Sequence, residues 1–258
     1  MSERTKGGSI DIVVGGQFGD ESKGQVCAHL MVERKYDFAV RVGGSNAEHR
    51  FCNPQNERFC ARVLPVAAWI DPKIKIFLGA GHVIKLDSLF AEIYSLKERW
   101  GCDQTDRIFI DPQAGVVAPV HVTKGKKTWE RGSTRQGIGA SVAHKVLRDG
   151  TYKLAQDYYK LQPYIKGRVN EMIYEMLQHN GVIGLLEGNQ GALLSLDHGF
   201  YPYNTSKNPT PTGLLAELGI GMKWVRDIYA AYRCIPMRVP GKSGPSRGQE
   251  LSWDELEK

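Results

Sequence analysis

The stretch Ile10-Asp-Ile-Val-Val-Gly-Gly-Gln-Phe-Gly-Asp-Glu-Ser-Lys-Gly24 joins a short apolar run to a glycine-rich, charged loop. The run Ile10–Val14 predicts a buried strand, and the glycines after it predict a turn. From Ser22 to Glu33, apolar residues recur at helical spacing, which predicts a helix. Backbone N–H groups freed by glycine, the start of a helix and the ammonium group of Lys23 are all suited to binding a phosphate. Strand, phosphate-sized loop and helix in this order favour an α/β fold.

The glycine loop differs from the Walker pattern GxxxxGK[ST], because Ser22 precedes Lys23 and no Ser or Thr follows it. A standard P-loop ATPase is therefore disfavoured. Asp20 and Glu21 lie inside the loop, although carboxylates repel phosphates unless they bind Mg²⁺ or move a proton. Both carboxylates are candidate functional residues for that reason.

The alternation of strands and helices continues along the chain. We therefore predict an α/β fold with a P-loop-like, mostly parallel sheet flanked by helices, formed by residues 1–258 as a single nucleotide-binding domain. The patterns predict strands over Phe38–Val42, Ile74–Leu78, Arg107–Ile110 and Val182–Leu186, and helices over Leu86–Trp100, Tyr164–Leu177 and Gly213–Leu218.

The composition excludes several classes of protein. No apolar run approaches the roughly 20 residues that span a bilayer, and the polar first residues do not resemble a secretion signal, so we expect a cytoplasmic protein without a membrane partner. Five cysteines without a CxxC pair argue against a disulfide framework and a zinc site. A net charge of +6 fits an active site that holds several phosphates, but it also fits nucleic-acid binding.

Four motifs in this sequence resemble those of the adenylosuccinate synthetase family, in the same order along nearly the whole chain. The matches are Gln17–Gly24 with QWGDEGKG, Gly43–His49 with GGNNAGH, Gly132–Gly139 with GTTGRGIG, and Glu187–Ser206 with EGAQG…DHGTYPYVTS. The resemblance implies a carbon–nitrogen ligase of purine biosynthesis. Such an enzyme phosphorylates O6 of a purine nucleotide with ATP or GTP, and the amine of aspartate then displaces that phosphate at C6.

The resemblance also implies catalytic roles. Asp20 matches the family's base and magnesium ligand, His49 matches its acid, and Lys23 is the lysine of the loop. This chemistry needs a base for the N1 proton, an acid near O6 and Mg²⁺ to screen the triphosphate. The backbone carbonyl of Glu48 matches a second magnesium ligand.

Further positions match residues that bind the nucleotides. They are Gly19, Glu21, Ser22 and Gly24 in the first motif, together with Asn46, Ser133, Thr134, Gln190, Thr205 and Val239. Arg148 resembles an arginine that the family supplies from the neighbouring subunit, which implies a homodimer. The alternative for Arg148 is a solvated arginine at a helix end.

The chain departs from the family pattern at several points. Ser22 and Glu48 stand where glycine is usual, and Arg50 replaces a threonine. The Glu48 carboxylate would repel a triphosphate unless it points away or binds the metal. We find neither the family's aspartate-binding loop nor its TKxD-type base-recognition segment before Lys258. A truncated chain, a second polypeptide and nucleotide binding without ligation are all consistent with that observation.

The purine substrate is the second open point. The segment Arg233–Gly244 resembles phage-type relatives that act on dGMP, whereas Asp20 is retained as in enzymes that act on IMP. Two other functions compete with the ligase: another phosphoryl-transfer enzyme such as a nucleotide kinase, and a basic nucleic-acid-binding protein. We expect small-molecule substrates rather than nucleic acid.

Overall fold

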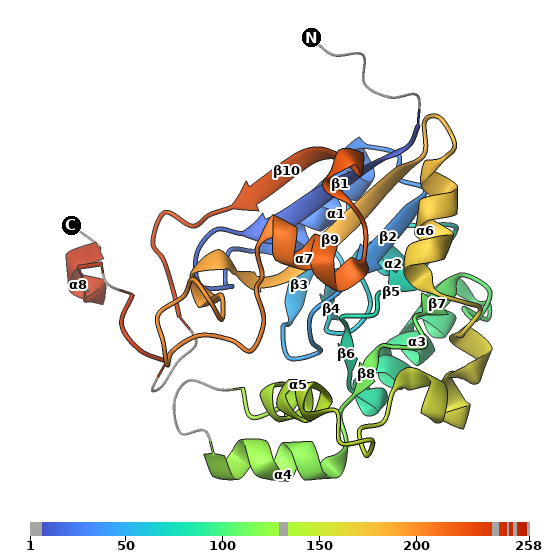
Figure 1. Cartoon of the computed structure of the whole chain (residues 1–258). Helices are drawn as coiled ribbons and strands as arrows, with labels where there is room; N and C mark the ends of the chain where they lie inside the picture. Colours follow the sequence, from blue (N-terminus) through green and yellow to red (C-terminus); the bar gives the residue numbers. More distant parts are fainter. Residues whose placement is uncertain (1–6, 129–133, 239–242, 247, 250–251, 257–258) are drawn as a thin grey trace.

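The computed structural model describes residues 7–128, 134–238, 243–246, 248–249 and 252–256. The fold is α/β, as predicted (Figure 1). Its strands are β1 (Ser9–Gly15), β2 (Phe38–Arg41), β3 (His49–Cys52), β4 (Arg58–Ala61), β5 (Lys75–Leu78), β6 (Val83–Ile84), β7 (Ile108–Ile110), β8 (Gly115–Val116), β9 (Ile183–Gly191) and β10 (Val225–Ala231). Its α-helices are α1 (Lys23–Glu33), α2 (Ala67–Ile70), α3 (Leu86–Trp100), α4 (Pro119–Thr128), α5 (Ile138–Leu147), α6 (Val169–Leu177), α7 (Pro211–Leu218) and α8 (Trp253–Leu256).

Six strands form one sheet in the order β10-β1-β9-β2-β5-β7, and every pair in it is parallel. The carboxyl ends of the strands therefore meet at one edge. Ligands of open parallel sheets bind at that edge. The first, second and fourth motifs all follow or end strands there, because Gln17 follows β1, Gly43 follows β2 and Glu187 lies in β9.

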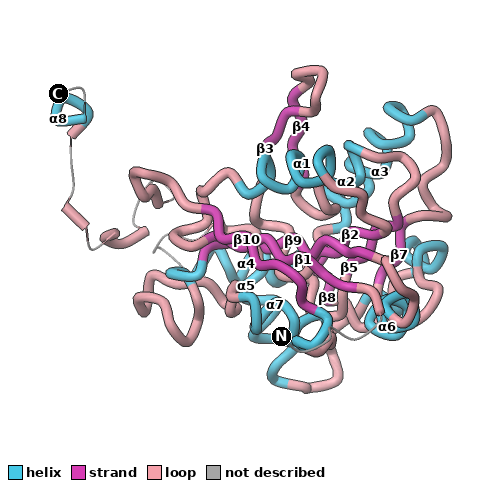
Figure 2. Tube along the Cα trace, turned by 90° about the horizontal axis from the view of Figure 1, so that it is seen from above, coloured by secondary structure: helices cyan, strands magenta, loops and turns pink. Residues whose placement is uncertain are grey.

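Helices cover both faces of the sheet (Figure 2). Alternate strand residues point to opposite faces, so one strand contributes to two cores. Val13 of β1 packs with Cys27, Leu30 and Met31 of α1, and α2 and α3 complete this core. The neighbouring strand residues Ile12 and Val14 pack in the second core, which α6 and α7 cover. Both faces are thus apolar, as expected for a buried parallel sheet.

Two predicted elements differ from the structure by more than two residues at one end. The predicted helix Tyr164–Leu177 begins as an α-helix only at Val169, because residues 159–164 form a 3₁₀ helix with Pro163 inside it and Gly167 has a φ of 141°. The predicted strand Val182–Leu186 continues to Gly191. Its last residues, Glu187–Gly191, begin the fourth motif, which therefore starts in the sheet.

Helices α4 and α5 pack against each other at the end of the molecule next to β6 and β8 (Figure 1). The third motif ends at Gly139 in the first turn of α5. Among the described residues, no helix combines the length and the apolar character that crossing a membrane requires.

Candidate active site

Glycines bring the four motifs together, because a side chain at several of them would collide with another motif. A Cβ atom at Gly191 would overlap the carbonyl of Gln17 and lie 2.5 Å from the amide of Gly19. One at Gly24 would lie 2.9 Å from Cβ of His49. The first motif therefore touches both the fourth and the second.

The third motif joins the same cluster. A Cβ atom at Gly44 would lie 2.7 Å from Ile138, the first residue of α5. Gly43 has a φ of 96° and is packed against Asn189, whose amide donates to the carbonyl of Gly44 at 2.9 Å. The structure thus places all four motifs at the carboxyl edge of the sheet.

Glu21 and Lys23 form an ion pair inside the first loop. The Glu21 carboxylate accepts hydrogen bonds from the amides of Gln17 (3.2 Å) and Gly19 (2.6 Å). Lys23 Nζ donates to Glu21 at 2.8 Å and to the carbonyl of Gly19 at 2.9 Å, and both side chains are 1% exposed. Ser22 then enters α1 in the left-handed conformation, with a φ of 57°. Two backbone amides and an ammonium group, the donors that suit a phosphate, converge here on a carboxylate.

Asp20 differs from Glu21 in being accessible. Its side chain is 56% exposed, and Arg233 lies 3.7 Å from it. Two hydrogen bonds between the side chain of Gln17 and the backbone of Arg233 hold that segment against the loop. The Asp20 carboxylate therefore faces solvent at the amino end of α1.

His49 is buried beside the first turn of α1. Its Nδ1 lies 2.6 Å from Oε1 of Glu187, while its buried Nε2 has no hydrogen-bond partner among the described residues. Burial, then the nearby Arg41, lower the pKa of His49 to about 4, although Glu187 opposes the shift. The ring is therefore neutral near pH 7, and because an ionised carboxylate only accepts, Nδ1 carries the hydrogen.

Polar groups around Glu187, the hydrogen-bond partner of His49, hold its carboxylate in place. Glu187 is fully buried and accepts from the amide of Val66 at 2.8 Å, with Arg41 at 3.6 Å. Burial alone would raise the pKa of Glu187, but His49 and Arg41 outweigh it and lower the pKa. Arg41 in turn donates to Oδ1 of Asn189 at 2.6 Å and to the carbonyl of Leu64 at 3.0 Å.

The sequence reasoning did not single out Arg41, Glu187 or Asn189. Two signals were available. Glu187 and Asn189 stand in the fourth motif, and Arg41 is a charged residue that ends an otherwise apolar strand. Buried charged and polar side chains need hydrogen-bonding or ionic partners, so each of these three residues indicated a polar contact at the ends of the strands.

Glu48 points toward arginines. Its carboxylate lies 2.6 Å from Arg50 and 2.6 Å from Arg62, on the hairpin formed by β3 and β4. The hydrogen bond from Arg50 is the main reason why the pKa of Glu48 is lowered. Glu48 first, and Asp20 among the weaker contributors, raise the pKa of Arg50. Glu48 and Arg50 are both departures from the family pattern, and their opposite charges thus compensate each other next to the first loop.

Some of the other predicted nucleotide-binding residues lie near motif glycines, and others do not. Asn46 faces Gly44, and the backbone carbonyl of Gln190 lies beside Gly15. The amide of Thr205 donates to Leu194, and Ser206 approaches Gly139 of α5. Thr134 is exposed before α5, and Arg148 caps the other end of that helix with a φ of 53°. Ser133 and Val239 lie outside the described residues.

Comparisons with known proteins identify the family. The sequence profile described as adenylosuccinate synthetase matches residues 12–156 and 151–252. The chain belongs to the adenylosuccinate synthetase family. This adenylosuccinate synthetase homologue is 33% identical over 252 residues to the adenylosuccinate synthetase of Methanococcus aeolicus, covering 96% of this chain and 71% of that protein. It is 31% identical over 261 residues to the N6-succino-2-amino-2'-deoxyadenylate synthase of Vibrio phage phiVC8, covering 96% and 74%.

Solved structures of this type have the same fold. The succinoaminodeoxyadenylate synthetase of cyanophage S-2L, bound to dGMP and to dATP as an energy donor, superposes with a TM-score of 0.79 at 24% identity and covers 92% of this chain and 69% of its own. Fully ligated adenylosuccinate synthetase from Plasmodium falciparum gives 0.71 at 22% identity, with 87% and 61% covered. The predicted family and fold are confirmed. Membership places the homologue among the nucleotide-dependent ligases of purine biosynthesis.

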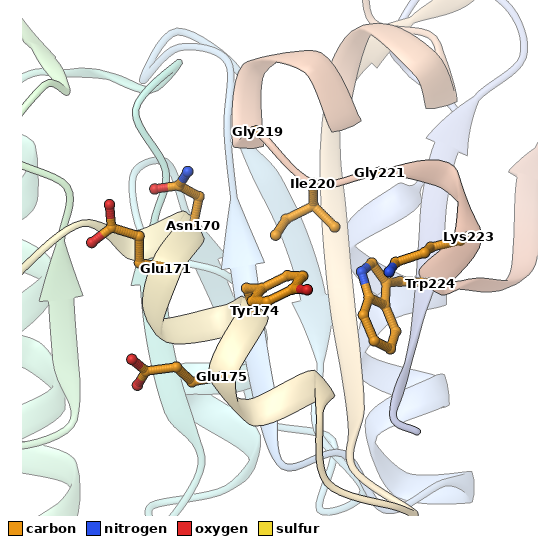
Figure 3. Close-up of a pocket in the computed structure, with 9 residues that line it drawn as sticks. All are labelled: Asn170, Glu171, Tyr174, Glu175, Gly219, Ile220, Gly221, Lys223 and Trp224. Carbon is orange, nitrogen blue, oxygen red and sulfur yellow. The ribbon is translucent and has the colours of Figure 1, made fainter. Parts of the chain in front are cut away.

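A pocket of about 470 Å³ lies elsewhere, between α6 and the segment that leads into β10 (Figure 3). The rings of Tyr174 and Trp224 pack edge to face there, 5.9 Å apart, and Lys223 Nζ lies 4.6 Å above the Trp224 ring. This pocket is at the amino-terminal edge of the sheet, away from the four adenylosuccinate synthetase motifs. We therefore do not assign the purine to it.

Proposed function

We propose that this chain joins L-aspartate to C6 of a 6-oxopurine nucleotide, dGMP or IMP, through a 6-phosphoryl intermediate formed with ATP or GTP. One observation carries the proposal. His49 is buried at the amino end of α1, its Nε2 has no hydrogen-bond partner among the described residues, and the neighbouring loop presents the accessible carboxylate of Asp20. A base and an acid at a phosphate-binding helix start are the groups that this reaction needs.

The chemistry assigns a step to each group. A lactam oxygen is a poor leaving group, so O6 must be phosphorylated before the amine of aspartate attacks C6 and phosphate departs. Asp20 would accept the N1 proton, which makes O6 nucleophilic toward the γ-phosphorus. Nε2 of His49, once protonated, would donate a hydrogen bond to the transferred phosphoryl oxygens. Their negative charge counteracts Arg41 and Lys23, two of the groups that keep the ring neutral.

Lys23 and the loop amides would bind the triphosphate. In the ligand-free chain these donors hold Glu21, so binding requires the Glu21 carboxylate to yield its place to a phosphate. Gly19, Ser22 and Gly24 give the backbone room for this exchange. By their match to the family motifs, Asn46, Ser133, Thr134, Gln190, Thr205 and Val239 would bind the purine nucleotide.

The accessible carboxylate of Asp20 fits Mg²⁺, which is commonly held by one or two carboxylates together with substrate phosphates. In the described part of the chain, no three His, Cys, Asp or Glu side chains gather as a ligand set. Asp20 and the backbone carbonyl of Glu48 would hold the Mg²⁺ ion. The ion would screen the charge of the triphosphate.

The testing experiment incubates the chain with aspartate and Mg²⁺ in a matrix of ATP or GTP against IMP or dGMP. We expect a succino product from one purine, which also identifies the phosphate donor. The resemblance of Arg233–Gly244 to phage-type relatives favours dGMP. Release of a nucleoside diphosphate product without any requirement for aspartate would instead identify a kinase.

The variant Asp20→Asn should keep the fold and lower turnover by about 10²–10⁴, the range for one general base. Circular dichroism and steady-state kinetics check both parts. Asp106→Asn is the matched control, because Asp106 is fully exposed and distant from the motifs. Near-normal turnover of Asp20→Asn would remove Asp20 from the mechanism.

A further inference from the structure

Among the described residues, Glu187 is the one hydrogen-bond partner of the His49 ring. Its Oε1 lies 2.6 Å from Nδ1 of His49, and the other ring nitrogen, Nε2, is buried without a partner among the described residues. When one ring nitrogen of a histidine is hydrogen-bonded and the other is not, the hydrogen bond determines which nitrogen carries the hydrogen and how the ring is oriented.

We propose that Glu187 is a positioning residue, which fixes His49 as the Nδ1–H tautomer and directs Nε2 toward the phosphates at the amino end of α1. This inference rests on the proposed function. Nothing in the family motif itself assigns this role to the glutamate.

The carboxylate of Glu187 is held from three directions. Its Oε2 accepts from the amide of Val66 at 2.8 Å, and Arg41 lies 3.6 Å from Oε1. Arg41 itself is fixed by Asn189 and by the carbonyl of Leu64. Because Glu187 lies in β9, between β1 and β2, the sheet backbone holds its main chain as well.

This arrangement selects one tautomer. An ionised carboxylate has no hydrogen to give, so a bond of 2.6 Å requires Nδ1 of His49 to be the donor. The lone pair of neutral His49 is then on Nε2. Replacing the carboxylate by an amide removes the selection, because an amide presents either an acceptor or a donor to Nδ1.

The first test is spectroscopic and needs no catalysis. Nitrogen-15 chemical shifts of His49 in the ligand-free protein at pH 7.5 should report Nδ1–H, with Nε2 unprotonated. Glu187→Gln should shift the populations toward Nε2–H. A wild-type ring protonated at Nε2 alone would overturn the proposal even if the variant fails to fold.

The second test is kinetic. Glu187→Gln should lower kcat on the order of 10²-fold, as expected when an acid–base group is misdirected, and leave each nucleotide KM within about threefold. Glu92→Gln is the matched control. Glu92 is also a buried carboxylate, but it accepts only from the amides of residues 62–64, so its loss should destabilise the fold without changing the His49 shifts or kcat.

Equal losses of kcat in the two variants, with an unchanged His49 spectrum, would make Glu187 a structural residue and overturn the proposal. Failure of the wild-type chain in the substrate matrix has a different meaning. It would remove the proposed ligase reaction, while the tautomer measurement would still decide whether Glu187 directs the ring.

Discussion

Glu48 lies one residue before His49 and extends its carboxylate between two arginines. Arg50 is 83% exposed and Arg62 is 47% exposed, so both ion pairs are largely solvated. Exposed pairs contribute about 0–1 kcal/mol to stability. Their main effect is therefore on the local potential beside Asp20 and the first loop.

The variant Glu48→Gln removes one negative charge there. We expect the KM of the triphosphate to fall by about two- to fivefold at low salt, and the difference to shrink as salt screens the freed arginines. Unfolding free energy should change by less than about 1 kcal/mol. Glu33→Gln, the same change at the exposed far end of α1, is the control. A higher KM for Glu48→Gln would show that the carboxylate assists binding.

Gly191 allows the first and fourth motifs to meet. The variant Gly191→Ala should cost about 1–3 kcal/mol or more, because its Cβ would collide with backbone rather than with a movable side chain. Denaturant unfolding measures the loss, and nucleotide binding should weaken with it. Gly221→Ala is the control: nothing lies within 4 Å of its Cβ, and its φ of −76° suits alanine. Equal stability of the two variants would contradict this packing.

At the scale of elements, the sequence predicted the strands and helices that have unbroken apolar patterns. Helix α3 has the predicted bounds, and β1, β2, β5 and β7 lie within one or two residues of theirs. The edge strand β10 was not predicted. Only one of its sides pairs with the described sheet, and Arg226 and Asp227 interrupt its apolar pattern near the start.

The sequence also predicted part of the candidate site. Glycines and charged residues in loops mark a phosphate site in sequence, and the structure brings those loops together. Arg41, Glu187 and Asn189 are recognised only by their partners, which are distant in the chain. Sequence spacing cannot show a bond between residues 138 positions apart, such as that of His49 with Glu187.

Helices α4 and α5 are joined by a directional chain of hydrogen bonds. The amide of Ala118 donates to Nδ1 of His121, whose Nε2 lies 2.9 Å from Nδ1 of His144. Nε2 of His144 then meets Thr151 at 2.8 Å and Asp149 at 3.2 Å. The ring of Tyr152 packs on both imidazoles, and Lys124 adds positive charge near His121. A further proton on either imidazole would turn its accepting Nδ1 into an N–H group, so that two N–H donors would face each other.

These hydrogen bonds predict that the contact between α4 and α5 loosens at acidic pH. Burial first, then His144 and Lys124, lower the pKa of His121 below its usual 6.5. His121 therefore binds fewer protons in the folded state than in the unfolded state, so the stability that it contributes is present above about pH 6.5 and is lost as pH falls. Hydrogen exchange of residues 119–128 and 138–147, corrected for intrinsic rates, should rise between pH 7.5 and 5.5 faster than in the sheet. His121→Gln should flatten this dependence of hydrogen exchange on pH, whereas the control His29→Gln, at an exposed histidine, should not. Equal slopes of exchange against pH in the two variants would contradict the role of His121.

At the scale of the whole molecule, α5 presents an apolar end to solvent. Val146 is 69% exposed and Leu147 is 71% exposed, directly before Arg148. Exposed apolar side chains beside a candidate phosphate ligand favour a contact with a second copy of the chain. We propose a homodimer in which Arg148 reaches the partner's nucleotide site.

The variant Leu147→Asp should shift the chain toward monomer, because a charge cannot be buried cheaply in an interface. Sedimentation equilibrium measures the shift, and specific activity should then fall on dilution. Val32→Asp is the control, since Val32 is 52% exposed on α1. Wild-type chain that is monomeric at micromolar concentration and fully active would end the dimer proposal and the role of Arg148.

The strand order has a consequence for how the chain folds during synthesis. Strand β1 emerges from the ribosome before its neighbours β9 and β10, which end at Gly191 and Ala231. This apolar strand must therefore stay unpaired while more than 170 residues are translated, roughly 9 to 35 seconds at about 5–20 residues per second. Contacts this distant in sequence slow folding and leave apolar surface open to aggregation. We expect the nascent chain to depend on chaperones until β9 inserts between β1 and β2.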